Sequence, residues 1–148
     1  YIGLNKTKLL QSLLLGAALA ICLLIGMAIY FQVKKGEVIG ITYPILSSLG
    51  IFLIGAIEEE IIFRGYIQTR LTGIIRQDLL CSFCTALLFL AMHYPIHWVI
   101  GGFFLSSLSL YHVICLIILH FVYKKTNCLW RAIVLHLLYN IGQSMLIL

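Results

Sequence analysis

The sequence predicts an all-α fold, a polytopic transmembrane helix bundle with about five membrane helices. Of the 148 residues, 62% are hydrophobic and only 10% are Asp, Glu, Lys or Arg, and the mean hydropathy is +1.08. A soluble domain carries about 25% charged residues, so a surface this poor in charge would not stay dispersed in water. The composition also excludes an intrinsically disordered chain, and five cysteines are too few for a disulfide scaffold.

The clearest candidate span runs from Leu9 to Phe31. This apolar run can cross the roughly 30 Å hydrocarbon layer of a bilayer. Lys6 and Lys8 precede it, and Lys34 and Lys35 follow it. The apolar region of a signal peptide has only about 7 to 15 residues, so we expect a retained membrane helix.

We divide the chain into an N-terminal helix and loop, residues 1–43, and a core of residues 44–148. Pro44 suits the first turn of a helix, and the helical pattern then continues without another proline to about Ile75. At 1.5 Å per residue this second helix would be roughly 45 Å long. A bilayer core requires less, so the helix should tilt, bend or extend into the cytoplasm.

Three further helices are predicted, over Leu79–Met92, about Ser109–Tyr123 and about Leu129–Leu148. Pro95 is expected to end the first of them, because proline removes a helical hydrogen bond. Residues 94–107 contain two glycines and two serines besides Pro95. We expect a broken or re-entrant stretch there, which is tolerated at membrane depth only where it lines protein or a wet cavity.

Basic residues are unequally shared between the two sides of the predicted bundle. Two lie on the far side, Lys34 and Lys35, and seven on the side of the N-terminus: Lys6, Lys8, Arg70, Arg76, Lys124, Lys125 and Arg131. The positive-inside rule then places the N-terminus in the cytoplasm and, after five crossings, the C-terminus outside. The partner is therefore the lipid bilayer, by composition a bacterial plasma membrane. No basic stripe interleaved with aromatic residues predicts a nucleic acid.

Three adjacent glutamates interrupt the second helix, in GAIEEEIIFRG. An acidic residue at a membrane helix centre costs roughly 2.5 to 3.5 kcal/mol, so we expect these residues to have a function. Glu60 and Arg64 are four residues apart on one face and can pair. Glu59 points about 100° away from Glu60, lacks that partner and is a candidate general base for water. The alternative is a juxtamembrane charge cluster, with the bilayer boundary near residue 57.

Two histidines and an asparagine lie in other apolar helices. His93 closes the third helix, and His136 shares a face of the fifth helix with Asn140. Counted from the cytoplasmic ends, His93 and Glu59 lie roughly 20 Å deep, Asn140 about 16 Å and His136 about 10 Å. We expect these four side chains to approach one layer inside the membrane.

The remaining histidines are expected outside this group. Pro95 separates His97 from His93, so His97 is interpreted as a loop residue and not as the second half of a metal pair. His112 and His120 are eight residues apart on one face of the fourth helix, where core packing or interhelical hydrogen bonding is the default.

Three motifs therefore stand in order, EEIIFR at 59–64, FLAMH at 89–93 and HLLYN at 136–140. They resemble the EExxxR, FxxxH and HxxxN boxes of the CPBP (Abi) family. These are CAAX-processing and bacteriocin-processing membrane proteases related to the type II CAAX prenyl endopeptidase. The resemblance covers about residues 44–145. All three boxes in the right order and on hydrophobic helices form a specific signal.

The resemblance implies an intramembrane endopeptidase that uses a Glu–His pair to activate water. By motif position, Glu59 and His93 would hold and deprotonate the water. His136 and Asn140 would stabilise the developing oxyanion. Two further residues, Glu60 and Arg64, would support the site.

Whether a metal takes part stays open at this point. Glu59, His93, His136 and Asn140 could ligate Zn²⁺, which would lower the pKa of its bound water. Asn is an unusual zinc ligand, however, and HExxH is absent. The family's naming favours a metalloprotease, whereas the residue set works equally well without metal.

The implied substrate is a membrane-associated peptide or protein, such as a prenylated CAAX protein, a pheromone or a bacteriocin leader. One alternative is a non-catalytic bacteriocin-immunity or scaffold protein on the same fold, which would be free to lose the four implied catalytic residues. A proton or ion transporter would also explain intramembrane Glu and His, but it predicts a continuous polar path.

Overall fold

The computed structural model describes the backbone of residues 9–35, 40–41, 46–100 and 107–147 and the side chains of 9–33, 48–93 and 112–145. The helices in chain order are α1 (Leu9–Lys35), α2 (Leu46–Glu60), η2 (Ile61–Gln68), α3 (Thr69–Ile74), α4 (Asp78–Ile100), α5 (Ser107–Thr126) and α6 (Leu129–Met145). Two-residue strands, β1 (Gly40–Ile41) and β2 (Leu146–Ile147), pair antiparallel.

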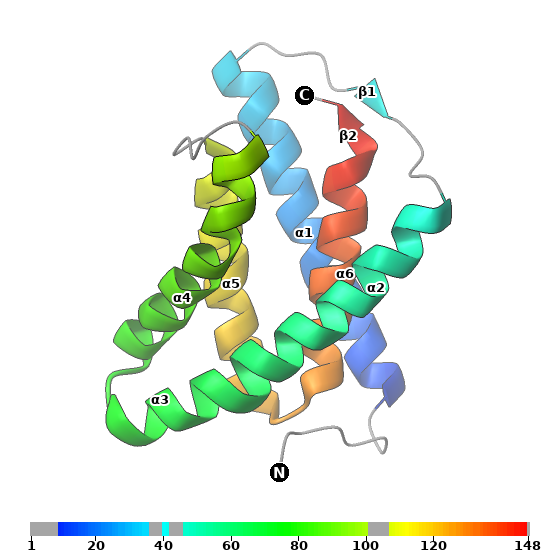
Figure 1. Cartoon of the computed structure of the whole chain (residues 1–148). Helices are drawn as coiled ribbons and strands as arrows, with labels where there is room; N and C mark the ends of the chain where they lie inside the picture. The colour runs from blue at the N-terminus through cyan, green and yellow to red at the C-terminus, as the bar shows by residue number, and fades with distance from the viewer. Residues whose placement is uncertain (1–8, 36–39, 42–45, 101–106, 148) are drawn as a thin grey trace.

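The helices α2, η2 and α3 follow one another without a break, so the described chain has five helical segments (Figure 1). This confirms the predicted all-helical bundle with five helices. The predicted second helix, from Pro44 to about Ile75, is observed over Leu46–Ile74. Pro44 itself and the pair Lys6 and Lys8 lie outside the described residues.

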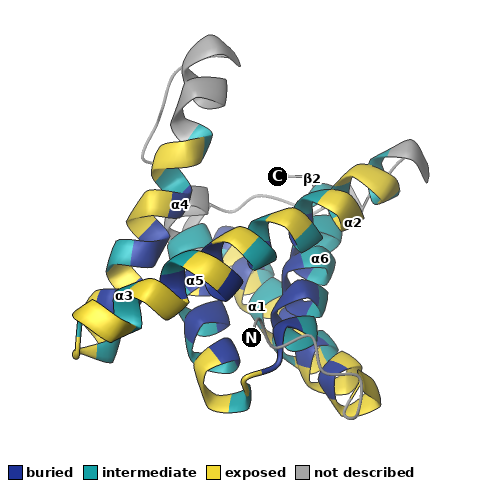
Figure 2. Cartoon of the chain, turned by 60° about the horizontal axis from the view of Figure 1, so that its bottom comes forward, coloured by how far each residue is buried: buried dark blue, intermediate teal, exposed yellow. Residues whose placement is uncertain are grey.

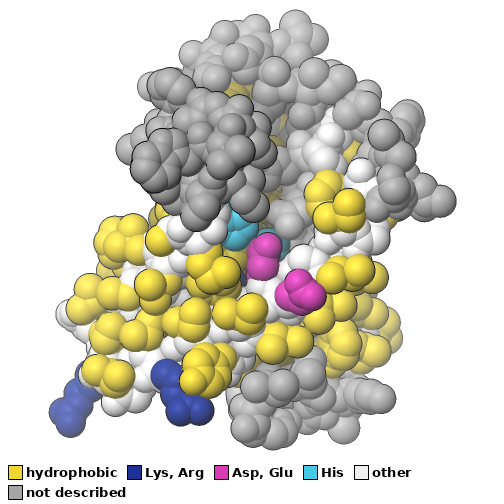
Figure 3. Space-filling view, viewed as in Figure 1, with side chains coloured by type: hydrophobic (Ala, Val, Ile, Leu, Met, Phe, Trp, Pro, Cys, Tyr) yellow, Lys and Arg dark blue, Asp and Glu magenta, His cyan; other side chains and the backbone are white. Residues whose placement is uncertain are grey.

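The described surface is rich in large apolar side chains. Helix α1 is long and apolar enough to cross a membrane over Leu9–Val33, and Asp78–His93 is a shorter apolar helix. Several large side chains on the outer faces are more than half exposed, among them Leu10, Ile25 and Ile51. Figure 2 shows exposed residues along these outer faces, and Figure 3 shows hydrophobic side chains over much of one face. Lipid tails would cover such a surface without cost.

Helices α1 and α6 pack closely, side by side (Figure 1). A Cβ atom added at Gly16 would lie 3.0 Å from the carbonyl oxygen of Arg131 and 3.0 Å from the Val134 side chain. Any larger residue at position 16 would push the two helices apart. The small residue therefore permits the approach, as is common in membrane bundles.

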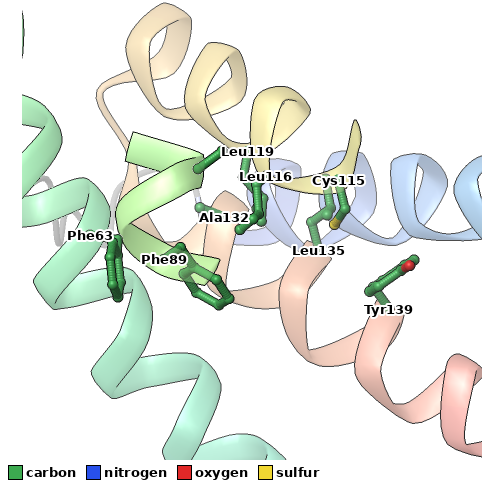
Figure 4. Packing of buried hydrophobic residues seen from close by; sticks show 9 residues of the cluster. Phe63, Phe89, Cys115, Leu116, Leu119, Ala132, Leu135 and Tyr139 are labelled. Carbon is green, nitrogen blue, oxygen red and sulfur yellow. The ribbon is translucent and has the colours of Figure 1, made fainter. Parts of the chain in front are cut away.

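The main core lies where η2, α4, α5 and α6 meet (Figure 4). Its aromatic centre is formed by Phe63 and Phe89, whose ring centroids are 4.8 Å apart. The other buried members are Ala86, Cys115, Leu116, Leu119, Ala132, Leu135 and Tyr139. Because this core joins the helices that carry the three motifs, it sets the distances between their polar side chains.

The structure corrects the prediction for Pro95. Helix α4 continues through Pro95 to Ile100, so His97 lies on helical backbone and not in a loop. Proline removes one hydrogen bond. In an apolar setting the other backbone groups still need partners, so continuing the helix costs less than exposing them. The rest of the predicted broken stretch, residues 101–106, lies outside the described residues.

The π-helix η2 is not signalled by the sequence pattern. It follows directly after Glu60 and contains IIFRGYIQ, with Phe63, Arg64, Gly65 and Gln68 buried. Extended π-helical turns are rare and are frequently found at functional sites. Here the π-helical turns begin directly after Glu60. Because a π-helix is wider than an α-helix, these turns change the directions in which the residues after Glu60 face α5 and α6.

Candidate active site

The carboxylate of Glu59 lies between two imidazole rings that come from two other helices. Its Oε1 is 3.6 Å from Nε2 of His93 on α4, and its Oε2 is 3.5 Å from Nε2 of His136 on α6. Glu59 and His93 remain about one-third exposed, at 30% and 36%. Figure 3 shows acidic side chains beside histidine on an otherwise largely hydrophobic face. A substrate arriving from outside the bundle can therefore reach this group.

His93 is fixed in one orientation by its own helix. Its Nδ1 lies 2.9 Å from the carbonyl oxygen of Phe89, one turn earlier. A carbonyl only accepts hydrogen bonds, so Nδ1 carries the proton, and Nε2 of the neutral ring is an acceptor that faces Glu59. The Phe89 ring stacks on the imidazole at 4.5 Å.

His136 is held from the opposite side by a buried charge pair. Its Nδ1 lies 2.8 Å from Oε1 of Glu60, and the same oxygen is 3.0 Å from Nη1 of Arg64. Glu60 and Arg64 are 0% and 1% exposed. Arg64 also donates through Nη2 to the carbonyl oxygen of Leu116, at 3.4 Å. Buried charges persist when they are paired and hydrogen-bonded. Here the ion pair and these contacts supply part of that need, while Glu60 Oε2 and Arg64 Nε have no hydrogen-bond partner among the described residues.

The structure thus brings Glu59, His93 and His136 into one group, with Glu60 against His136. Asn140 lies one turn beyond His136 on α6 and is half-buried, and in the described part of the chain no hydrogen bond joins it to the group. Sequence reasoning did not find the link between Glu60 and His136. They are 76 residues apart, and no local spacing signals such a contact.

The third glutamate of the run differs from its neighbours. Glu58 is exposed, and none of the described residues forms an ion pair with it. The three adjacent carboxylates therefore occupy three environments. Glu58 is exposed, Glu59 lies between two histidines, and Glu60 is buried against Arg64. Of the three, Glu59 faces the histidines and Glu60 pairs with Arg64.

The family model for type II CAAX prenyl endopeptidase, Rce1-like, matches residues 41–142. The chain belongs to this family. The Rce1-like region contains α2 through most of α6, and with them all three motifs, while α1 precedes it. Rce1-like proteins are integral membrane proteases, which agrees with the apolar surface and with α1. No curated protein and no solved structure matches the chain.

The donor set of this Rce1-like site does not form a metal cage in the described part of the chain. There, no group of three His, Cys, Asp or Glu side chains is arranged to hold a metal ion. Each histidine bonds through Nδ1, to Phe89 or to Glu60, and turns Nε2 toward Glu59. Such a bond at the second nitrogen is also usual for metal-ligating histidines. Glu59 and His93 can act on a water molecule without a metal as well.

Proposed function

We propose that the chain is an intramembrane endopeptidase that hydrolyses a peptide bond of a membrane-associated peptide or protein. The observation that carries this proposal is the position of the Glu59 carboxylate between the Nε2 atoms of His93 and His136, at 3.6 and 3.5 Å. These separations are longer than a direct hydrogen bond, and a water molecule can bridge groups at such distances.

Glu59 and His93 supply complementary functions toward that water. The unprotonated Nε2 of His93 accepts one hydrogen bond from the water, and Glu59 accepts the proton that leaves. The water oxygen then attacks the carbonyl carbon of the scissile peptide bond. Glu59 afterwards passes the proton to the nitrogen of the departing amine, so proton and charge balance over the cycle.

His136 and Asn140 are the proposed donors to the oxyanion that forms during this attack. The Asn140 amide can donate directly. His136 already donates from Nδ1 to Glu60, so donation from Nε2 requires a proton on both ring nitrogens. Glu60 and Arg64 keep the ring in the orientation that this role requires. Such donors act by stabilising charge that appears only in the transition state.

A substrate within the bilayer suits the surroundings of the site. Large apolar side chains flank the glutamates along the same helix, including the exposed Ile54 and Ile62. A prenylated or otherwise apolar peptide could lie against this surface and present its scissile bond to Glu59. We propose a CAAX-type or leader-peptide substrate in a bacterial plasma membrane.

The basic ends of the helices support a cytoplasmic N-terminus. Arg70, near the start of α3, and Arg76, just after this helix, are exposed. Lys124 in the last turn of α5 pairs with Asp78 at the start of α4. Helix α1 begins at this same end of the bundle (Figure 1). The positive-inside rule places this end in the cytoplasm.

The test compares adjacent glutamates in purified protein reconstituted into liposomes. The probes are an internally quenched farnesylated CAAX peptide and an internally quenched leader peptide. We expect Glu59→Gln to lower the cleavage rate by about 10³-fold, because the proton acceptor is lost. The matched control Glu58→Gln, a change at an exposed and unpaired residue, should stay within about twofold of the parent rate.

Full activity of Glu59→Gln at normal expression would refute the proposed mechanism. Absence of cleavage by the parent protein, combined with protection of cells against a bacteriocin, would favour the non-catalytic immunity or scaffold function instead. Equal losses in Glu58→Gln and Glu59→Gln would show that the three carboxylates act as an undivided charge cluster.

A further inference from the structure

A second set of buried polar side chains lies behind the candidate active site, between η2 and α5. Arg64 and Gln68 are one turn apart on η2, and each donates to a backbone carbonyl of α5. Arg64 Nη2 reaches the oxygen of Leu116 at 3.4 Å, and Gln68 Nε2 reaches the oxygen of His120 at 3.2 Å. The polar face of η2 therefore follows α5 turn by turn. We call this contact, made by Arg64, Gln68 and His120, the η2–α5 seam.

The seam contains more polar atoms than its own contacts satisfy. Arg64, Gln68 and His120 are 1%, 2% and 0% exposed. Within the described part of the chain, Arg64 Nε, Gln68 Oε1 and both ring nitrogens of His120 have no hydrogen-bond partner. More than nine-tenths of buried polar groups in proteins are paired with protein or with ordered water. Four unpaired atoms on three neighbouring side chains are therefore a local excess.

The three side chains of the seam meet the same stretch of α5. A helical side chain leans toward the N-terminus of its helix, so the ring of His120 lies over the turn that begins near Leu116. Arg64 bonds to α5 at that level, and Gln68 bonds one turn later. The backbone contacts therefore place Arg64, Gln68 and His120 within about one turn of α5.

The unpaired atoms differ in the hydrogen bonds that they need. Arg64 Nε can only donate, Gln68 Oε1 can only accept, and a neutral imidazole offers one donor and one acceptor. Water both donates and accepts, and buried waters typically make about three hydrogen bonds to groups of this kind. We propose that the η2–α5 seam is a binding site for ordered water, held by Gln68 and His120 and reaching Arg64 Nε.

The bound water would support the active site from behind. A hydrogen bond to Arg64 Nε holds the guanidinium in the plane in which Nη1 meets Glu60 and Nη2 meets Leu116. Glu60 in turn holds His136. Gln68 and His120 lie away from the reacting atoms, and the water site does not depend on what the enzyme cleaves.

The test is the melting temperature of the full chain in detergent micelles, which requires no substrate. His120→Phe keeps an aromatic ring and removes both nitrogens, and Gln68→Met keeps the length of the side chain. With water bound, we expect each variant to melt about 2 to 6 °C lower. The melting temperature of the double variant should be close to that of the less stable single variant, because both residues hold the same water and it can be lost only once.

The matched control is Ile114→Phe on the same helix. Ile114 is 37% exposed and has no polar atom in its side chain. The melting temperature of this variant should therefore change less than that of His120→Phe. A higher melting temperature for His120→Phe would overturn the proposal, because removing dry, unpaired nitrogens stabilises a core. Additive losses in the double variant would overturn it as well.

A direct observation decides the matter if a variant fails to fold. A high-resolution density map of the parent protein should show water within about 3.2 Å of Gln68 Oε1 and of one ring nitrogen of His120. A map that shows well-ordered side chains and an empty seam would refute the site.

Discussion

Replacement of Arg64 by methionine should be among the most destabilising single changes in the described part of this protein. Arg64 is 1% exposed and lies 3.0 Å from the carboxylate of Glu60, which is 0% exposed. Methionine retains the length and the apolar stem of the side chain but removes the guanidinium. Glu60 would then stay buried with His136 as its remaining partner.

The magnitude follows from the burial of the pair. Removal of one member of a buried ion pair typically costs about 3 to 5 kcal/mol, because the other charge is left uncompensated. The free energy of unfolding of a native protein is about 5 to 15 kcal/mol, so this loss is a large fraction of it. The pair Lys124–Asp78 provides the contrast, because its side chains are 42% and 45% exposed. An exposed pair contributes about 0 to 1 kcal/mol.

The assay is reversible unfolding in mixed micelles, followed by tryptophan fluorescence while the denaturing detergent is titrated. We expect Arg64→Met to lose about 3 to 5 kcal/mol and the control Lys124→Met less than about 1 kcal/mol. The double variant Glu60→Gln/Arg64→Met should be more stable than Arg64→Met alone, because the uncompensated charge is gone. A loss for Arg64→Met as small as that for Lys124→Met would refute the reasoning.

Three further predictions concern packing, ring orientation and metal. Gly16→Ala should destabilise by about 1 to 3 kcal/mol, because its Cβ would lie 3.0 Å from the Arg131 carbonyl oxygen. A Cβ added at Gly26 on the same helix would meet nothing within 4 Å, so Gly26→Ala should be neutral or stabilising in the same unfolding assay. Equal losses in the two variants would contradict the close contact of α1 with α6. Phe89→Leu should lower kcat more than it raises KM, because it removes the ring stacked on His93. An unchanged kcat would show that this ring is not needed to orient His93. Cleavage should persist after chelation, because Glu59 and His93 can activate the water without a metal. A loss of cleavage that added Zn²⁺ restores would establish the zinc alternative.

The helical segments were predictable because their signals are local. Apolar runs interrupted by charge set the approximate bounds of α1, of the segment from α2 to α3, of α5 and of α6. The prediction for Pro95 was wrong because a propensity of one residue was given more weight than the hydrogen-bonding needs of the whole helix. The π-helical turns of η2 cover eight residues, which are too few for the apolar pattern to distinguish them from α-helix.

The sequence by itself determined which residues are out of place in lipid, since charge and hydropathy are properties of composition and order. It identified Glu59, His93 and His136 as candidates, and the pairing of Glu60 with Arg64 followed from the spacing on one helix. Only the tertiary structure decided that Glu59 faces both histidines and that Glu60 also holds His136. These contacts join helices far apart in the chain. Their distances depend on how the core between η2, α4, α5 and α6 packs, and no local pattern encodes that packing.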